Sequence, residues 1–237
     1  MHRAGRIVAG TIEKVTAAVR PGATTESLDT VAEEYIRTQG ALPSFKGYRG
    51  FPASICTSVN DQVVHGIPGP RVLKPGDILS LDFGAIWEGY HADSAVTVFV
   101  GDPPSDQAEK LVRVTEEALE AGIGQLVTGK RLSDIGHAVQ QVVEGAGFSV
   151  VREYVGHGIG RSLHEDPPIP NYGPPGRGPD IGPGLVVAIE PMVNAGGWET
   201  RVLADDWTVV TADGSLSAHF EHTVAVTEDG PVVLTAA

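Results

Sequence analysis

The feature that most constrains the fold of this chain is a predicted β-hairpin whose turn is Glu88-Gly89. Apolar runs at residues 78–86 and 95–100 flank this pair. An X-Gly pair between two such runs is typical of a two-residue turn, because glycine adopts a positive φ at little steric cost. The length of the turn fixes which residues of the two strands pair. A three-residue loop would shift this pairing and so change which side chains share a face.

With a two-residue turn, the register places Asp82 opposite Ala95, and Asp93 is two residues from Ala95. Both carboxylates then lie on one face of the hairpin, as diagonal neighbours roughly 7–8 Å apart. The simpler alternative is a solvated polar face with two unrelated acids. The surrounding residues are apolar, however, and an unpaired charge among them is costly. We therefore expect a cation to compensate these two acids.

The composition limits the class of protein. A chain of 237 residues can bury a substantial core, and we expect a single catalytic domain over residues 1–237. The formal net charge of −13 argues against nucleic-acid binding, which needs a basic patch. The single Cys56 excludes an intrachain disulfide and a thiolate cluster, and it fits a reducing compartment. No run reaches the roughly 18 apolar residues of a membrane span, so we expect a cytoplasmic protein.

The spacing of apolar residues predicts two pairs of helices. The first pair covers residues 4–19 and a segment that begins near Thr24. The second pair begins at a capping box formed by Asp106 and Glu109, and its second helix spans about residues 132–144.

These helix pairs resemble two copies of one unit. An offset of 107 residues aligns their apolar positions without a gap, and it also maps Gly22 onto Gly129. Two amphipathic helices could match at their apolar positions by chance. Chance explains less easily why glycines also match, since the same offset maps Gly40 onto Gly147. We therefore predict an internal duplication of helix–helix–sheet units, at about residues 4–102 and 106–230.

The predicted repeat extends to polar side chains. Offsets of 108, 128 and 92 residues match Asp82 with Glu190, Asp93 with Glu221, and His65 with His157. If an approximate two-fold axis relates the halves, all six groups meet in one cleft and form a metal site. The alternative is six solvated polar residues on strand edges, which leaves their matched positions in apolar strands unexplained.

The donor types narrow the choice of metal. Carboxylate and imidazole ligands without thiolate suit Co, Mn, Fe or Zn, and the sequence does not rank these metals. Two divalent ions about 3.5–4 Å apart balance four carboxylates better than one ion does. We therefore predict two divalent metal ions as the cofactor.

An ordered set of motifs resembles the type I methionine aminopeptidases over essentially residues 3–230. These motifs are residues 54–68, Asp82-Phe-Gly, His91-Ala-Asp93, Gly156-His157-Gly-Ile-Gly, Ile189-Glu190-Pro-Met and Phe220-Glu221-His-Thr. The resemblance implies an α+β fold of the pita-bread type, in which two pseudo-two-fold-related halves surround a central curved antiparallel sheet. It also implies the short bacterial form, without an N-terminal zinc-binding extension.

The resemblance assigns roles to individual side chains. It implies five metal ligands: Asp82, Asp93, His157, Glu190 and Glu221. Asp93 and Glu221 would bridge the two ions, and Glu190 would also act as general base. His65 and His164 would contact the substrate and stabilise the tetrahedral intermediate. A histidine in a glycine-rich loop is otherwise a turn or core residue.

The substrate pocket matches the family less completely. The expected lining for the methionine side chain is Tyr48, Phe51, Cys56 and Trp207, although each of these alone could be an ordinary core residue. Arg49 and Leu163 stand where family members commonly have His and Phe, and Phe45 stands where a second Cys is often found. These differences leave the metal ligands intact but bear on side-chain preference.

The resemblance implies an enzyme that removes the N-terminal methionine from nascent proteins and favours a small second residue. Its partners would be peptide substrates, association at the ribosome exit is compatible with that role, and we expect a monomer without membrane or nucleic-acid specificity. A proline-specific peptidase of the same fold is the nearest alternative, but it usually carries an additional N-terminal domain. A non-catalytic binding module is the second alternative, but such modules lose metal ligands.

Overall fold

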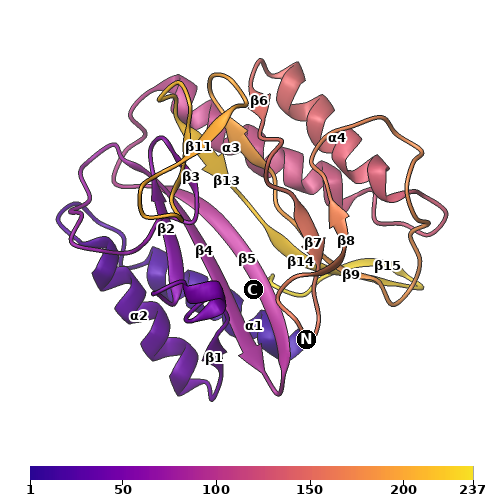
Figure 1. Ribbon diagram of the computed structural model, residues 1–237, viewed down its shortest axis with the longest axis horizontal. Helices are drawn as coiled ribbons and strands as arrows, with labels where there is room; N and C mark the ends of the chain where they lie inside the picture. Colours follow the sequence, from indigo (N-terminus) through magenta and orange to yellow (C-terminus); the bar gives the residue numbers. More distant parts are fainter. Residues whose placement is uncertain (237) are drawn as a thin grey trace.

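Helices cover small antiparallel sheets in the computed structural model, which describes residues 1–236 (Figure 1). The helices are α1 His2–Thr16, α2 Thr25–Thr38, α3 Asp106–Ile123 and α4 Leu132–Gly145, with a short 3₁₀ turn η1 at Tyr48–Gly50. This mixture of helices and antiparallel sheets confirms the predicted α+β class. Among the described residues, no helix combines the length and apolar character needed to cross a membrane.

The strands of the described residues form four sheets. The first contains β1 Leu42–Pro43, β2 Ile55–Val59, β4 Ile78–Trp87 and β5 Tyr90–Phe99, with β4 paired to the other three. The second has the order β13-β10-β6, with bounds Ser217–His219, Met192–Asn194 and Ser149–Val150. The third has the order β11-β12-β3, with bounds Thr200–Val202, Val209–Thr211 and Gln62–Val64. The fourth has the order β15-β14-β9-β7-β8, with bounds Gly230–Val233, His222–Thr227, Val186–Ile189, Gly156–Gly158 and Glu165–Ile169.

The helix ends show where local sequence rules held. Thr24 caps α2 as predicted, because its hydroxyl accepts a hydrogen bond from the N–H of Ser27 at 3.2 Å. The capping box predicted at Asp106 was wrong by one residue. Ser105 is the cap of α3, since its backbone is extended and its hydroxyl accepts a hydrogen bond from the N–H of Ala108 at 3.2 Å.

The first helix also ends earlier than predicted. α1 ends at Thr16 rather than at residue 19, because the N–H groups of Ala18 and Val19 bond to the carbonyls three residues before them, which tightens the last turn. The two helix pairs lie on opposite sides of the molecule in Figure 1. The internal duplication itself stays a prediction.

The central hairpin has the predicted turn and register. In the β4–β5 ladder, Trp87 pairs with Tyr90 and Asp82 pairs with Ala95. The turn residues Glu88 and Gly89 have φ values of 49° and 77°, as a tight two-residue hairpin turn requires. The two acids of the hairpin therefore share one face, as the parity argument predicted.

The two faces of β4 have different roles. Leu79, Leu81 and Phe83 are fully buried in a core that includes residues of α1 and α2. Side chains alternate along a strand, so Asp82 points to the other face. The same strand thus anchors the helices on one side and presents a carboxylate on the other.

Backbone hydrogen bonds join the N-terminal and C-terminal sheets beside this hairpin. Ala95 on β5 and Glu221 exchange N–H···O bonds of 3.3 Å and 2.9 Å. Close by, the hydroxyl of Thr223 donates to the carbonyl of Asp93 at 2.7 Å and accepts from its N–H at 2.9 Å. This junction holds Asp93 beside Glu221, although the two residues are far apart in the sequence.

The packing of β4 on the helices yields a stability prediction. Leu81→Ala should lower the free energy of unfolding by about 2–5 kcal/mol, because it removes a fully buried side chain and leaves a cavity. Urea unfolding of wild type and variant measures this difference. Leu42→Ala is the matched control: Leu42 is 54% exposed, and a loss as large as that of Leu81→Ala would contradict the assigned core.

Candidate active site

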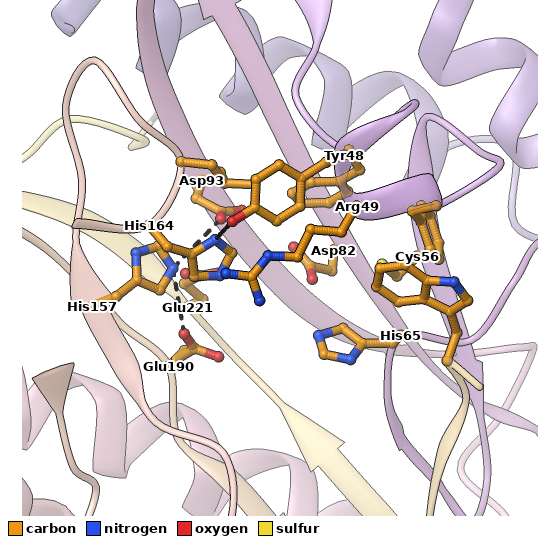
Figure 2. Close-up of a pocket in the computed structure, with 14 residues that line it drawn as sticks. Tyr48, Arg49, Cys56, His65, Asp82, Asp93, His157, His164, Glu190 and Glu221 are labelled. Atoms are coloured by element: carbon orange, nitrogen blue, oxygen red, sulfur yellow. Dashed lines mark hydrogen bonds and ion pairs between the residues drawn. The ribbon is translucent and has the colours of Figure 1, made fainter. Parts of the chain in front are cut away.

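One pocket contains every side chain to which the sequence analysis assigned a role (Figure 2). Its lining residues are Phe45, Tyr48, Arg49, Phe51, Cys56, His65, Asp82, Asp93, His157, Leu163, His164, Glu190, Trp207 and Glu221. The cavity volume of about 140 Å³ is roughly ten times the 10–15 Å³ that one water molecule needs, so it has room for ions and a small side chain.

The acids and one histidine converge from different strands. Asp82 lies on β4, Asp93 on β5 and His157 on β7, whereas Glu190 directly follows β9 and Glu221 directly precedes β14. Ligand atoms of Asp93, His157 and Glu221 all lie within 4.8 Å of one another. Nε2 of His157 is 3.6 Å from Oε1 of Glu190 and 3.9 Å from Oδ2 of Asp93. Figure 2 shows Asp93, His157, Glu190 and Glu221 on one side of the pocket, His65 and Cys56 on the other, and Asp82 between the two groups.

His157 has the protonation pattern of a metal ligand. Its Nδ1 lies 2.9 Å from the carbonyl oxygen of Gly158, which can only accept a hydrogen bond, so Nδ1 is the donor. Burial lowers the pKa of His157, which keeps the ring neutral. The lone pair of Nε2 is then directed at the carboxylates and is available to a cation.

Burial and mutual repulsion destabilise the ionised carboxylates. Burial raises the pKa of Asp82 to about 7. Burial and then the neighbouring carboxylates also raise the pKa values of Asp93, Glu190 and Glu221 well above their usual range. Four such groups in one pocket cannot all ionise without a compensating positive charge.

Unpartnered oxygen atoms give a direct test of whether a cation fits. Oδ1 of Asp82, Oδ1 of Asp93 and Oε1 of Glu221 are buried and have no hydrogen-bond partner among the described residues. Buried polar atoms normally have a partner, and these three face a cavity lined by further carboxylates and an imidazole. Oxygen and nitrogen donors of this kind fit a divalent metal ion.

Neighbouring polar groups hold the backbone of the acids in place. Oγ of Ser94 donates to the carbonyl of Glu221 at 2.6 Å. Nδ2 of Asn171, a fully buried residue, donates to the carbonyl of Glu190 at 3.0 Å. The acids therefore sit on a backbone that is fixed from several elements.

The two remaining predicted histidines border the cluster. His164 is stacked on the ring of Tyr48, and its Nδ1 lies 2.9 Å from the Tyr48 hydroxyl. Its ring centroid is 4.1 Å from that of His157. His65 has a positive φ of 60° and makes edge contacts with Trp207 and Tyr154. A positive φ is uncommon for a residue other than glycine and often marks a functional position.

An apolar wall forms another side of the pocket, and its Cys56 pairs with Asp82 across the β2–β4 ladder. Phe45, Phe51, Cys56 and Leu163 are buried together, and Trp207 packs on them with its ring edge-on to Phe51. Burial raises the pKa of the Cys56 thiol, so this side chain stays neutral. Arg49 is the one lysine or arginine among the described lining residues, and its guanidinium lies over the Tyr48 ring.

The structure adds two residues that the sequence analysis missed. Nε2 of His219 lies 3.8 Å from Oε2 of Glu190, and the backbone of Glu190 is held by Asn171. A signal for His219 was present in the sequence, because it precedes Glu221 by two residues and alternate residues of an extended strand share a face. No comparable sequence signal marks Asn171, which comes close to Glu190 only through the fold.

Comparisons with known proteins agree with this geometry. The model for metallopeptidase family M24 matches residues 1–228. Methionine aminopeptidase 1 of Bacillus subtilis is 59% identical over 99% of this chain and 94% of its own length. The crystal structure of methionine aminopeptidase from Thermotoga maritima covers all of this chain and 95% of its own, with a TM-score of 0.98 and 47% identity. Prolidase from Pyrococcus furiosus shares the fold, with a TM-score of 0.81 and 20% identity over all of this chain and 62% of its own.

The buried acids yield a prediction about pH. In protein stripped of metal, the melting temperature should fall as the pH rises from about 6.5 to about 8. A carboxyl group whose pKa is raised by folding stabilises the protein while it is protonated, and it loses that contribution as the pH rises through its folded-state pKa. The pKa of Asp82 is about 7, and the pKa values of Asp93, Glu190 and Glu221 are also raised. His65 and His164, with lowered pKa values, oppose this trend only near the lower end of the range, where histidine of the unfolded chain is still partly protonated. Adding Mn²⁺ at pH 8 should raise the melting temperature again.

Two variants test whether the dependence of the melting temperature on pH and Mn²⁺ comes from the acids of the pocket rather than from the overall charge of the protein. Asp93→Asn removes a buried charge, so it should flatten the pH dependence and abolish the increase caused by Mn²⁺. Asp102→Asn changes an exposed acid and should leave both unchanged. If Mn²⁺ does not change the melting temperature of the wild-type protein, the metal site is ruled out.

Proposed function

This chain belongs to metallopeptidase family M24, and we propose from this premise that its buried cluster binds two divalent metal ions and uses them to release the N-terminal residue of peptides. The chain is a metal-dependent aminopeptidase with the pita-bread fold, as predicted. Similarity over nearly its whole length establishes the activity of a methionine aminopeptidase. The likeness to prolidase concerns the fold alone.

One observation carries the proposal about the site. Four carboxylates and the Nε2 atom of His157 converge beside an apolar wall. Asp93 and Glu221 are buried and the other two acids are half-buried, and several of the carboxylate oxygens have no partner among the described residues. A metal cluster would compensate the acids, and the wall would receive an unbranched side chain. The pocket would thus combine a metal cluster for catalysis with an apolar surface for the substrate side chain.

We assign the metal ligands as Asp82, Asp93, His157, Glu190 and Glu221, with Asp93 and Glu221 as the bridging carboxylates. Ligand atoms of Asp93, Glu221 and His157 lie within 4.8 Å of one another, which supports the bridging role. When bound, divalent ions polarise the scissile carbonyl and lower the pKa of water towards neutrality. The ligand set suits Co, Mn, Fe or Zn.

Glu190 serves as the proton carrier in this proposal. It would accept a proton from the attacking water and return it to the leaving amine. The hydrogen bond from Asn171 fixes its backbone during this transfer.

His65 and His164 would donate hydrogen bonds to the oxyanion. Burial lowers the pKa of both rings to about 4, so both act as neutral donors. If the Tyr48 hydroxyl donates to Nδ1 of His164, the proton of that ring is on Nε2 and is free to bind substrate. Donors of this kind stabilise charge that develops in the transition state.

The apolar wall would select the side chain of the first residue. Phe51, Cys56 and Trp207 form a surface suited to a thioether, with Tyr48 at its edge. We extend the proposal to nascent chains with a small second residue as substrates, in the cytoplasm. The predicted monomeric state and ribosome association also stay predictions.

The first functional prediction concerns substrate choice. With Mn²⁺ bound, kcat/KM should be highest for Met-Ala-Ser, lower for Leu-Ala-Ser and lowest for acetyl-Met-Ala-Ser, whose blocked amine cannot bind. A side chain that differs by one methylene changes transition-state binding by about 1–3 kcal/mol. Faster cleavage of Ala-Pro-Ser would instead indicate a proline-specific peptidase.

A second functional prediction concerns His65. His65→Ala should reduce kcat by about 10²–10³ while the affinity for Mn²⁺ stays unchanged, because an oxyanion donor acts mainly in the transition state. Calorimetric metal titration and steady-state kinetics measure the two effects separately. If the variant loses metal instead, His65 is a ligand and its assigned role is wrong.

A further inference from the structure

His219 is a buried histidine at the active site for which the sequence analysis assigned no role. It ends strand β13 and is 2% exposed. A buried imidazole is normally hydrogen-bonded through its ring nitrogens. Nε2 of His219 is buried and has no hydrogen-bond partner among the described residues.

The backbone of His219 is fixed by the opposite half of the protein. Its N–H donates to Oγ1 of Thr97 at 2.9 Å, and the same hydroxyl donates to its carbonyl at 2.7 Å. Thr97 lies on β5 and is in turn hydrogen-bonded to Ser80 on β4 at 2.8 Å. The strand register also pairs His219 with Met192 on β10, two residues after Glu190. The imidazole of His219 therefore extends from a fixed backbone position next to the segment that contains Glu190.

The free nitrogen faces the carboxylate of Glu190. Nε2 of His219 lies 3.8 Å from Oε2 of Glu190, which is slightly beyond a hydrogen bond. The other oxygen, Oε1, lies 3.6 Å from Nε2 of His157, on the side of the metal ligands. A buried neutral imidazole with its proton on Nε2 is a donor for Oε2, and a side-chain shift of under about 1 Å would close the bond.

We propose that His219 is a positioning residue for Glu190: its Nε2–H holds Oε2 and thereby keeps Oε1 directed at the metal ligands. Glu190 is then held at both ends, by Asn171 at its backbone and by His219 at its carboxylate. Outer residues that orient a ligand typically change metal affinity or activity 10–100-fold when they are replaced. This inference rests on the proposed role of Glu190 as ligand and proton carrier.

Two substitutions at position 219 distinguish positioning from packing. His219→Leu fills the space without a donor and should reduce kcat about 10–100-fold and weaken Mn²⁺ binding, with a smaller change in KM. His219→Gln restores an N–H donor at similar reach and should recover most of both losses. Steady-state kinetics and calorimetric Mn²⁺ titration of the full chain provide the measurements, and thermal melts confirm folding.

Ser217→Ala is the matched control, because Ser217 is a buried polar residue on the same strand and face whose hydroxyl bonds only within the second sheet. It should leave kcat and Mn²⁺ affinity unchanged. A double-mutant cycle with Glu190→Gln tests whether His219 acts through Glu190. His219→Leu should weaken Mn²⁺ binding when Glu190 is present, but it should weaken binding little further in the Glu190→Gln variant.

The outcomes separate this inference from the function on which it rests. The inference is wrong if His219→Leu behaves like wild type, if His219→Gln is as impaired as His219→Leu, or if the loss persists undiminished with Glu190→Gln. The proposed function itself fails if wild type neither binds Mn²⁺ nor cleaves Met-Ala-Ser.

Discussion

The architecture depends on the junction where β5 meets the segment before β14. Ala95 and Glu221 exchange backbone hydrogen bonds there, and Thr223 bonds to both backbone groups of Asp93. Two carboxylates from distant parts of the chain are thereby held side by side in a buried place, where their ionised forms repel each other. The backbone bonds supply the rigidity that makes this arrangement possible, and a cation that binds the carboxylates removes the repulsion. Metal binding and sheet docking are consequently coupled at one point of the fold.

Where local rules govern the structure, the sequence was sufficient. The turn at Glu88-Gly89 determined the register of the long hairpin, and with it the face on which Asp82 and Asp93 lie, because side-chain direction alternates strictly along a strand. The cap of α3 shows the limit of such rules. Ser105 and Asp106 are both good capping residues, and the choice between them depends on which backbone is extended in the folded protein.

The parts of the site that depend on tertiary packing could not be predicted from residues alone. Asn171 reaches the carbonyl of Glu190 from another loop, and nothing in its sequence context indicates that contact. His219 was accessible in principle through its spacing to Glu221, yet its relation to Glu190 follows from the pairing of β13 with β10. The internal offsets had already grouped the five candidate ligands with His65, and the motif resemblance separated His65 from them, because motifs contain three-dimensional information about related chains.

His65 and His157 show how one sequence pattern serves two purposes. An offset of 92 residues aligns them as equivalent positions. His157 lies within strand β7, and its Nδ1 is bound to a carbonyl, so its Nε2 is directed at the acids. His65 follows β3 with a left-handed backbone, and its ring contacts Trp207 and Tyr154 instead. Backbone conformation, rather than residue identity, therefore separates a side chain that can bind metal from one that can face the substrate across the same pocket. The predicted duplication would in this way supply both the proposed ligand and the proposed hydrogen-bond donor.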